Sequence, residues 1–174
     1  MKVYFNKITI ILLLCLSSIL STSMLTAAQS IYLLRHAEKH ADGTKDPSLT
    51  EVGRERANNL IALLKDKNIT SIYSTKYKRT LETVTPLAKS LKIDVQQYDP
   101  SKLQDFAEKI KTIEGNVVIV GHSNTTPELT HFISGKATIA MDESEYDRLY
   151  HITVNKDSMN LKTLRLRPFQ VHAK

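Results

Sequence analysis

The chain has 174 residues, of which 41% are hydrophobic and 24% are charged, with 5 glycines and 5 prolines. This composition excludes collagen-like, low-complexity and intrinsically disordered chains, and the length suits one domain. The single cysteine, Cys15, excludes a disulfide framework and a cysteine-based zinc site. The net charge of +6 favours anionic partners such as phosphates, membrane headgroups or nucleic acid.

The first 28 residues have the pattern of a secretory signal peptide. Lys2 and Lys7 form a basic start, an apolar run covers 8–20, and small residues precede a cleavage position after Ala28. The apolar run is short for a membrane span, which needs about 20 residues. We therefore expect residues 29–174 to form an exported domain, most simply in a bacterial periplasm. An uncleaved N-terminal anchor is the alternative.

Apolar patterning after residue 28 alternates short strands with amphipathic helices. In chain order, the predicted elements are strand 31–34, helix 50–65, strand 70–73, helix 76–91, strand 93–98, helix 101–113, strand 116–120 and a short helix that ends at Gly135. Alternating segments near 149–154 and 161–166 predict a hairpin. Thr50 is a predicted N-cap and Gly135 a predicted C-cap. This order predicts an α/β fold of three layers, with a mainly parallel central sheet between helices.

Polar and charged residues follow four of the predicted strands, at the point where each strand ends. They are Arg35-His36-Ala37-Glu38, Ser74 with Arg79, Asp99-Pro100, and Gly121-His122-Ser123-Asn124. Parallel sheets bind ligands at the carboxyl ends of their strands, so we expect these loops to converge. Two guanidinium groups provide bidentate donors for a phosphate, and helix N-termini add oriented N–H groups. The pattern therefore predicts a phosphate pocket.

The motifs together resemble those of the histidine phosphatase superfamily, which is also called phosphoglycerate-mutase-like. Arg35-His36-Ala37-Glu38 resembles the family signature, and Asp46-Pro-Ser-Leu-Thr50-x-x-Gly53 resembles the segment that enters the first helix. Ser74-x-x-x-x-Arg79-Thr80-x-x-Thr83 is similar to the second arginine motif, and Gly121-His122-Ser123-Asn124 to the second histidine motif. The family's order is kept over residues 31 to about 135. The short chain is similar to the small exported members, which lack the mutases' inserted cap.

This resemblance implies a phosphomonoester hydrolase that works through a phosphohistidine intermediate. His36 would be the nucleophile, and a covalent intermediate would split one difficult displacement into two easier ones. Arg35, Arg79 and His122 would hold the phosphoryl oxygens and stabilise the transition state. The resemblance implies no metal or other cofactor, because these cations would do that work. Candidate substrate contacts are Ser74, Asn124 and Glu38.

The general acid that protonates the leaving group has more than one candidate. Many family members carry a glutamate in the loop after the third strand, where this chain has Asp99. Asp99 precedes Pro100 and is equally consistent with a helix N-cap followed by proline at the first helical position. Glu128, four residues beyond Asn124, is the second candidate.

Two other functions remain open on the sequence alone. Ser123 lies between a predicted strand and a predicted helix, as the nucleophile of a serine hydrolase would, although Thr125 replaces the second glycine of that motif. The other function is a phosphate-ligand binding protein without turnover. A nucleic-acid partner is disfavoured because tryptophan is absent and no basic-aromatic interleaving is visible. The expected partner is a phosphorylated small molecule or an envelope-associated phosphate ester, with no membrane contact after signal cleavage.

Overall fold

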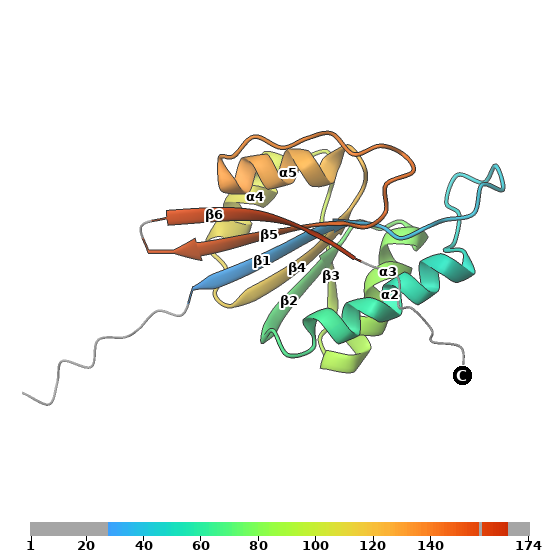
Figure 1. Cartoon of the computed structure of the whole chain (residues 1–174), viewed down its shortest axis with the longest axis horizontal. Coiled ribbons are helices and arrows are strands. Elements are labelled where there is room, and N and C mark those ends of the chain that lie inside the picture. The colour runs from blue at the N-terminus through green and yellow to red at the C-terminus, as the bar shows by residue number, and fades with distance from the viewer. Residues whose placement is uncertain (1–27, 157, 167–174) are drawn as a thin grey trace, which may run out of the picture.

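The computed structural model describes residues 28–156 and 158–166, so the predicted signal peptide lies outside the described residues except for Ala28. In chain order the elements are β1 (Gln29–Arg35), α2 (Glu51–Leu64), β2 (Ile69–Ser74), α3 (Lys78–Leu91), β3 (Val95–Gln97), α4 (Leu103–Lys111), β4 (Asn116–Gly121), α5 (Thr125–Ser134), β5 (Arg148–Asn155) and β6 (Ser158–Arg165) (Figure 1). The predicted alternation of strands and helices is confirmed. Over the described ranges, no helix combines the length and apolarity that crossing a membrane requires.

The strands form one six-stranded sheet in the order β3-β2-β4-β1-β5-β6. The pairs β2–β3, β2–β4 and β1–β4 are parallel, whereas β5 runs antiparallel to β1 and to β6. The mainly parallel sheet and the C-terminal hairpin are both confirmed. Because β1 and β4 lie in the middle of the sheet, their carboxyl ends are flanked by other strands on either side.

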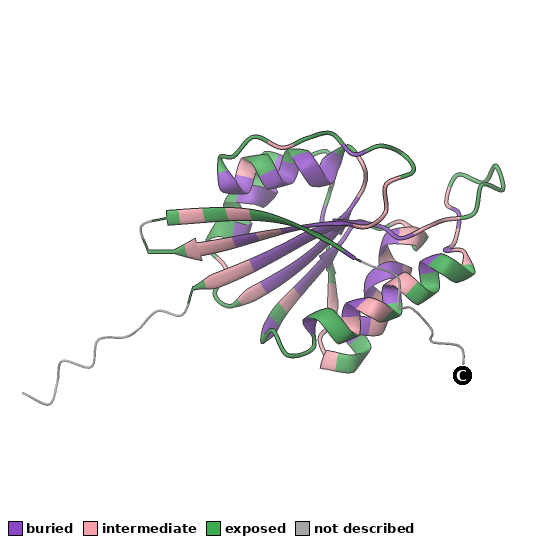
Figure 2. Cartoon of the chain, in the orientation of Figure 1, coloured by how far each residue is buried: buried purple, intermediate pink, exposed green. Residues whose placement is uncertain are grey.

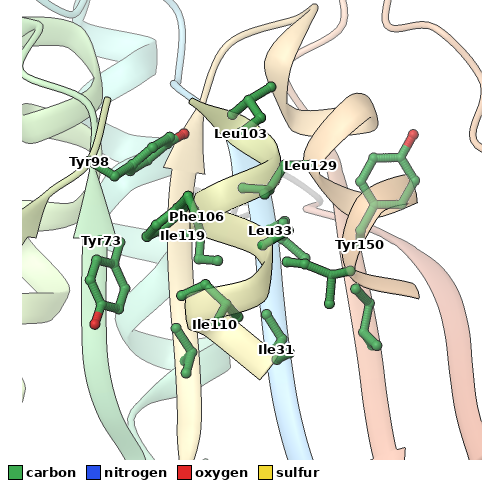
Figure 3. Close-up of a cluster of buried hydrophobic side chains, with 14 of the residues drawn as sticks. Ile31, Leu33, Tyr73, Tyr98, Leu103, Phe106, Ile110, Ile119, Leu129 and Tyr150 are labelled. Atoms are coloured by element: carbon green, nitrogen blue, oxygen red, sulfur yellow. The ribbon is translucent and has the colours of Figure 1, made fainter. Parts of the chain in front are cut away.

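Period-two alternation along the central strands sends side chains into two separate cores. Ile31 and Leu33 of β1 pack against the face that carries α4 and α5 (Figure 3). Tyr32 and Leu34 point the other way and pack with residues of α2 and α3. The central strands are buried along most of their length (Figure 2). Helices therefore cover both faces, as the three-layer prediction required.

The helix ends follow the predicted caps with one exception. Thr50 caps α2 by accepting a hydrogen bond from the Gly53 N–H over 3.1 Å, and Gly135 ends α5 with a φ of 66°. The N-cap of α4 is Lys102, so of the two alternatives for Asp99, the one in which it caps this helix is wrong. The Asp99 carboxylate instead accepts hydrogen bonds from the Ser101 N–H and hydroxyl, at 2.9 and 2.7 Å, which closes a turn before the helix.

Candidate active site

The candidate site lies where β1, β4 and β2 end side by side. The sheet register pairs Arg35 with Gly121, and the His36 N–H donates to the Gly121 carbonyl over 3.0 Å. His36 and His122 therefore each come directly after one residue of a pair in the sheet, and their ring centroids lie 5.7 Å apart. Arg79 comes from the first turn of α3, which follows β2. The structure thus brings these three strand ends together at one edge of the sheet.

A pocket of about 460 Å³ opens at this edge. Its positively charged lining residues are Arg35, Lys39 and Arg79, and its imidazoles are His36 and His122. Further polar lining comes from Tyr77, Ser101, Ser123, Asn124, Thr125 and Glu143. Three cations against one carboxylate make this a pocket that attracts anions.

His36 is held neutral with one ring nitrogen free to react. Its Nδ1 lies 2.8 Å from the carbonyl oxygen of Ala37. A carbonyl can only accept a hydrogen bond, so Nδ1 carries the proton and Nε2 keeps its lone pair. Burial lowers the pKa of His36 to about 3, and the nearby charges of Arg35 and Arg79 act in the same direction. The imidazole is therefore uncharged at neutral pH.

His122 is neutral through a different pair of contacts. Its Nδ1 lies 3.4 Å from Nη2 of Arg79, and its Nε2 lies 3.0 Å from the Thr75 hydroxyl. A guanidinium can only donate, so Nδ1 accepts and the Nε2–H donates to Thr75. Burial, followed by the charges of Arg79 and Arg35, lowers the pKa of His122 to about 4. An anion bound between the arginines would offset this repulsion and favour protonation of Nδ1.

Arg79 is positioned by two of the motif segments that the sequence singled out. Asp46 lies 3.7 Å from Nη1 of Arg79 and also accepts from the Lys78 N–H at the start of α3, at 2.9 Å. Thr83, one turn further along α3, accepts from the Ala37 N–H over 2.9 Å. These contacts attach α3 to the loop after β1, so the positions of Arg79 and His36 are fixed relative to each other.

Arg35 is almost completely buried and makes most of its contacts with one loop. Its Nη1 donates to the carbonyl oxygens of Asp142 and Glu143, both at 2.9 Å. Its Nη2 lies 2.6 Å from the Glu143 carboxylate. The buried Nε atoms of Arg35 and Arg79 have no hydrogen-bond partner among the described residues. The two guanidinium groups thus keep unused donor capacity.

Four of the predicted residues do not line this pocket. The Glu38 carboxylate is paired with Arg56 at 2.5 Å, and the fully buried Ser74 hydroxyl donates to the Thr75 carbonyl. Asp99 is exposed and lines a neighbouring depression with Lys76, and its carboxylate accepts hydrogen bonds from Ser101. Glu128 lines a second depression that adjoins the pocket at Pro100 and Ser101. Asn124, by contrast, lies in the pocket as predicted.

Two tyrosines and a carboxylate are among the site residues that the sequence reasoning missed. Tyr77 precedes Arg79 by two residues, and the Arg79 guanidinium carbon lies 4.4 Å from the centre of its ring. Tyr146 is placed in the same way against Arg35, also at 4.4 Å. Glu143 comes from the loop before β5, more than one hundred positions after Arg35. Of these, only Tyr77 could have been found from the sequence, because it lies two residues before Arg79 of the second arginine motif.

The arrangement of Ser123 does not match a serine hydrolase. Its hydroxyl donates to Glu143 over 2.5 Å. Within the residues that the structure describes, no histidine forms a hydrogen bond with Ser123, so no general base is in place to activate it. The same ranges contain no cluster of three or more His, Cys, Asp or Glu side chains suited to a metal ion.

We expect His36 and His122 to stay neutral far below the pH at which unfolded histidine titrates. Because their folded pKa values lie below the unfolded value of about 6.5, the unfolded chain binds more protons as pH falls. The free energy of unfolding should therefore decrease as pH drops from about 6.5 toward 4. NMR titration of the ring nitrogens, with His36→Asn and His122→Asn for assignment, measures both values. Titration of either ring near 6.5 in the folded protein would contradict the site geometry.

The sequence of residues 31–106 matches the family model described as "Histidine phosphatase superfamily (branch 1)". The matched segment includes Arg35, His36 and Arg79 but ends before His122. No curated protein has a significant sequence match to the chain.

Solved structures show the same fold at low sequence identity. The alpha-ribazole phosphatase from Shigella flexneri is 16% identical with a TM-score of 0.65, and the match covers 78% of this chain and 96% of that one. YhfR from Bacillus stearothermophilus is 17% identical with a TM-score of 0.63, covering 77% and 95%. The protein histidine phosphatase SixA in complex with tungstate is 13% identical with a TM-score of 0.62, covering 79% and 97%. Residues 31–106 thus match the histidine phosphatase superfamily model, and the fold around them is shared with solved phosphatases.

Proposed function

We propose that this chain is a member of the histidine phosphatase superfamily and hydrolyses phosphomonoesters through a phosphohistidine on His36. The observation that carries the proposal is a neutral imidazole, with Nε2 free, at an open pocket between two arginines. A neutral nucleophile with cationic neighbours is what displacement at an anionic phosphorus atom requires. The match of residues 31–106 to the family supports the same reaction.

In the first step, Nε2 of His36 attacks phosphorus and the bond to the ester oxygen breaks. The leaving alkoxide takes a proton from a water molecule in the open pocket, and the imidazole becomes an Nε2-phosphorylated cation that keeps its Nδ1–H. That proton already points at the Ala37 carbonyl, at 2.8 Å, so the positive charge is stabilised as it forms. In the second step, water attacks phosphorus, the P–N bond breaks, and neutral His36 is restored with inorganic phosphate.

Arg35, Arg79 and His122 surround the position that the phosphoryl oxygens would take. Each of them lines the pocket, and preorganised donors of this kind supply the largest share of transition-state stabilisation in phosphoryl transfer. The pocket therefore contains a nucleophile and its charge stabilisers without any rearrangement of the sheet.

The pocket has room for the alcohol part of a phosphate ester. It continues past Pro100 and Ser101 into a neighbouring depression of about 430 Å³, which is lined by Gln104, Asp105 and Glu128 among others. We therefore propose a phosphorylated small molecule or an envelope-associated phosphate ester as substrate. The names of the two phosphatases compared above, one for alpha-ribazole and one for protein histidine, show that this fold serves substrates of different size.

Replacing His36 should abolish turnover. We expect His36→Ala to release phosphate from an aryl phosphate at least about 10³-fold more slowly than the unaltered protein, because the nucleophile is lost. His40→Ala is the matched control, since His40 is exposed and does not line the pocket. Chelators should leave the rate unchanged, and acid-labile phosphate should be trapped on the unaltered protein only. Equal rates in both variants would refute His36, and loss of activity in Ser123→Ala alone would support a serine hydrolase.

Asp99 is expected to be dispensable for proton donation. Its carboxylate lies outside the pocket and is held by Ser101, so Asp99→Asn should turn over alkyl and aryl phosphates at nearly unaltered rates. Steady-state kinetics with leaving groups of different pKa measure this directly. A selective loss of about 10²-fold or more with alkyl phosphates would instead establish Asp99 as the general acid. Glu128→Gln is the parallel test for the second candidate.

We further propose that residues 1–28 are removed during export and that the domain acts outside the cytoplasm. The basic start, the short apolar run and the small residues before Ala28 support this, and residues 29–174 contain no cysteine that an oxidising compartment would affect. N-terminal sequencing of the protein from fractionated cells should start at Gln29. Recovery of the full-length chain from the cytoplasm would refute the proposal.

A further inference from the structure

A carboxylate of this chain already occupies part of the predicted phosphate position. Glu143 Oε2 lies 2.6 Å from Nη2 of Arg35, and Oε1 accepts a hydrogen bond from the Ser123 hydroxyl over 2.5 Å. All three residues line the pocket. The carboxylate therefore joins two of the groups that an incoming phosphoryl oxygen would contact.

The backbone beneath Glu143 is held in place from two sides. Arg35 donates to the Asp142 and Glu143 carbonyl oxygens, so this part of the loop is fixed to the end of β1. On either side of Glu143 in the chain, Arg148 donates to the Ile139 carbonyl over 2.6 Å and pairs with Glu145 at 2.6 Å. The side chain of Glu143, in contrast, is 77% exposed. Rotation of this side chain can thus clear the pocket while the loop stays attached.

The contact between Glu143 and Arg35 uses the donors that a phosphate needs. The Ser123 hydrogen bond and the Arg35 charge hold the pKa of Glu143 below its usual value, so the carboxylate is ionised at neutral pH. An anion that enters must either displace this carboxylate or bind beside a like charge, and both cost free energy. A monoanionic carboxylate ligand would gain nothing from such an exchange. An oxyanion with two charges would, because one charge can replace the carboxylate at Arg35 while the second interacts with Arg79.

We propose that Glu143 is a specificity-determining residue, an internal counter-ion that a doubly charged oxyanion displaces from Arg35 and Ser123. The inference rests on the proposed function in that it takes the pocket to be a phosphate site. It deepens that function in two ways: the pocket discriminates against carboxylate ligands, and it holds the product phosphate less tightly than two free arginines would. Glu143 acts here through the charge it places on Arg35 and not as a proton donor.

Sulfate is the probe for this proposal, because it is a doubly charged oxyanion that undergoes no turnover. Calorimetric titration of the full chain at pH 7 compares the unaltered protein with Glu143→Gln. Only the carboxylate of this ion pair is exposed, and breaking it costs up to about 1 kcal/mol, so the variant should bind sulfate up to about fivefold more tightly. Its selectivity for sulfate over acetate should fall in the same experiment. Because Glu143 is largely exposed, the variant is expected to fold, and Glu143→Ala provides a second test.

Asp142→Asn is the matched control for charge alone. Asp142 is the exposed neighbour of Glu143, and its carboxylate accepts from the Ser144 N–H at 2.8 Å, a hydrogen bond that asparagine can keep. This variant removes one negative charge from the same loop, but the Asp142 side chain makes no hydrogen bond with Arg35. Sulfate affinity should change by less than about twofold, since screening weakens charge effects that lack direct contact.

The outcomes separate this inference from the proposed function. Tighter sulfate binding by Glu143→Gln, without the same gain in Asp142→Asn, supports it even if no phosphate is released from an aryl ester. Equal gains in both variants, or sulfate binding that Glu143→Gln leaves unchanged or weakens, overturns it even if the protein is an active phosphatase. Lack of sulfate binding in every variant also overturns it. Loss of alkyl phosphate turnover at unchanged sulfate affinity would make Glu143 a proton donor and overturn the counter-ion role.

Discussion

The parallel pairing of β1 with β4 is the contact on which the rest of the site depends. It sets Arg35 opposite Gly121 and continues one residue further through the hydrogen bond from the His36 N–H to the Gly121 carbonyl. Both histidines then leave the sheet at the same level. Gly121 permits this because it lacks a β-carbon, which would lie 2.8 Å from the Tyr98 hydroxyl and 2.9 Å from the Thr126 hydroxyl. A larger residue would force the Tyr98 and Thr126 side chains or the end of β4 to shift.

Burial next to positive charge explains why both imidazoles are neutral. The burial that removes water from His36 and His122 disfavours their charged forms, and two arginines disfavour them further. One tyrosine accompanies each arginine: Tyr146 lies against Arg35 with its ring centre 6.0 Å from that of His36, and Tyr77 lies against Arg79 with its ring centre 5.1 Å from that of His122. The site therefore consists of two similar units, each with an arginine, a histidine and a tyrosine. Such a pocket combines positive charge with a nucleophile that is not itself charged.

Two loops complete the pocket, and neither is held by pairing between the central strands. The loop after β3 follows an edge strand, and it contributes Pro100 and Ser101 to the pocket while Asp99 lines a neighbouring depression. The loop before β5 has no regular structure of its own, and Arg35 and Arg148 hold it through backbone carbonyl groups. Glu143 is thus carried by contacts with arginine side chains and not by strand pairing. This gives the side chain the freedom that a displaceable counter-ion needs.

The sequence by itself determined the layered α/β fold, because short apolar runs and helical patterns are local, and the two central strands are unbroken apolar runs. It also determined which strand ends meet, since parallel strands place their carboxyl ends at one edge, and Arg35, His36, Arg79 and His122 lie there. Only the tertiary structure decided that Glu38 pairs with Arg56, that Asp99 turns toward Ser101, and that Glu143 reaches Arg35. These outcomes depend on the packing of irregular loops against residues far away in the chain. No local sequence pattern predicts such contacts, because the residues involved become neighbours only after the strands and helices have packed together.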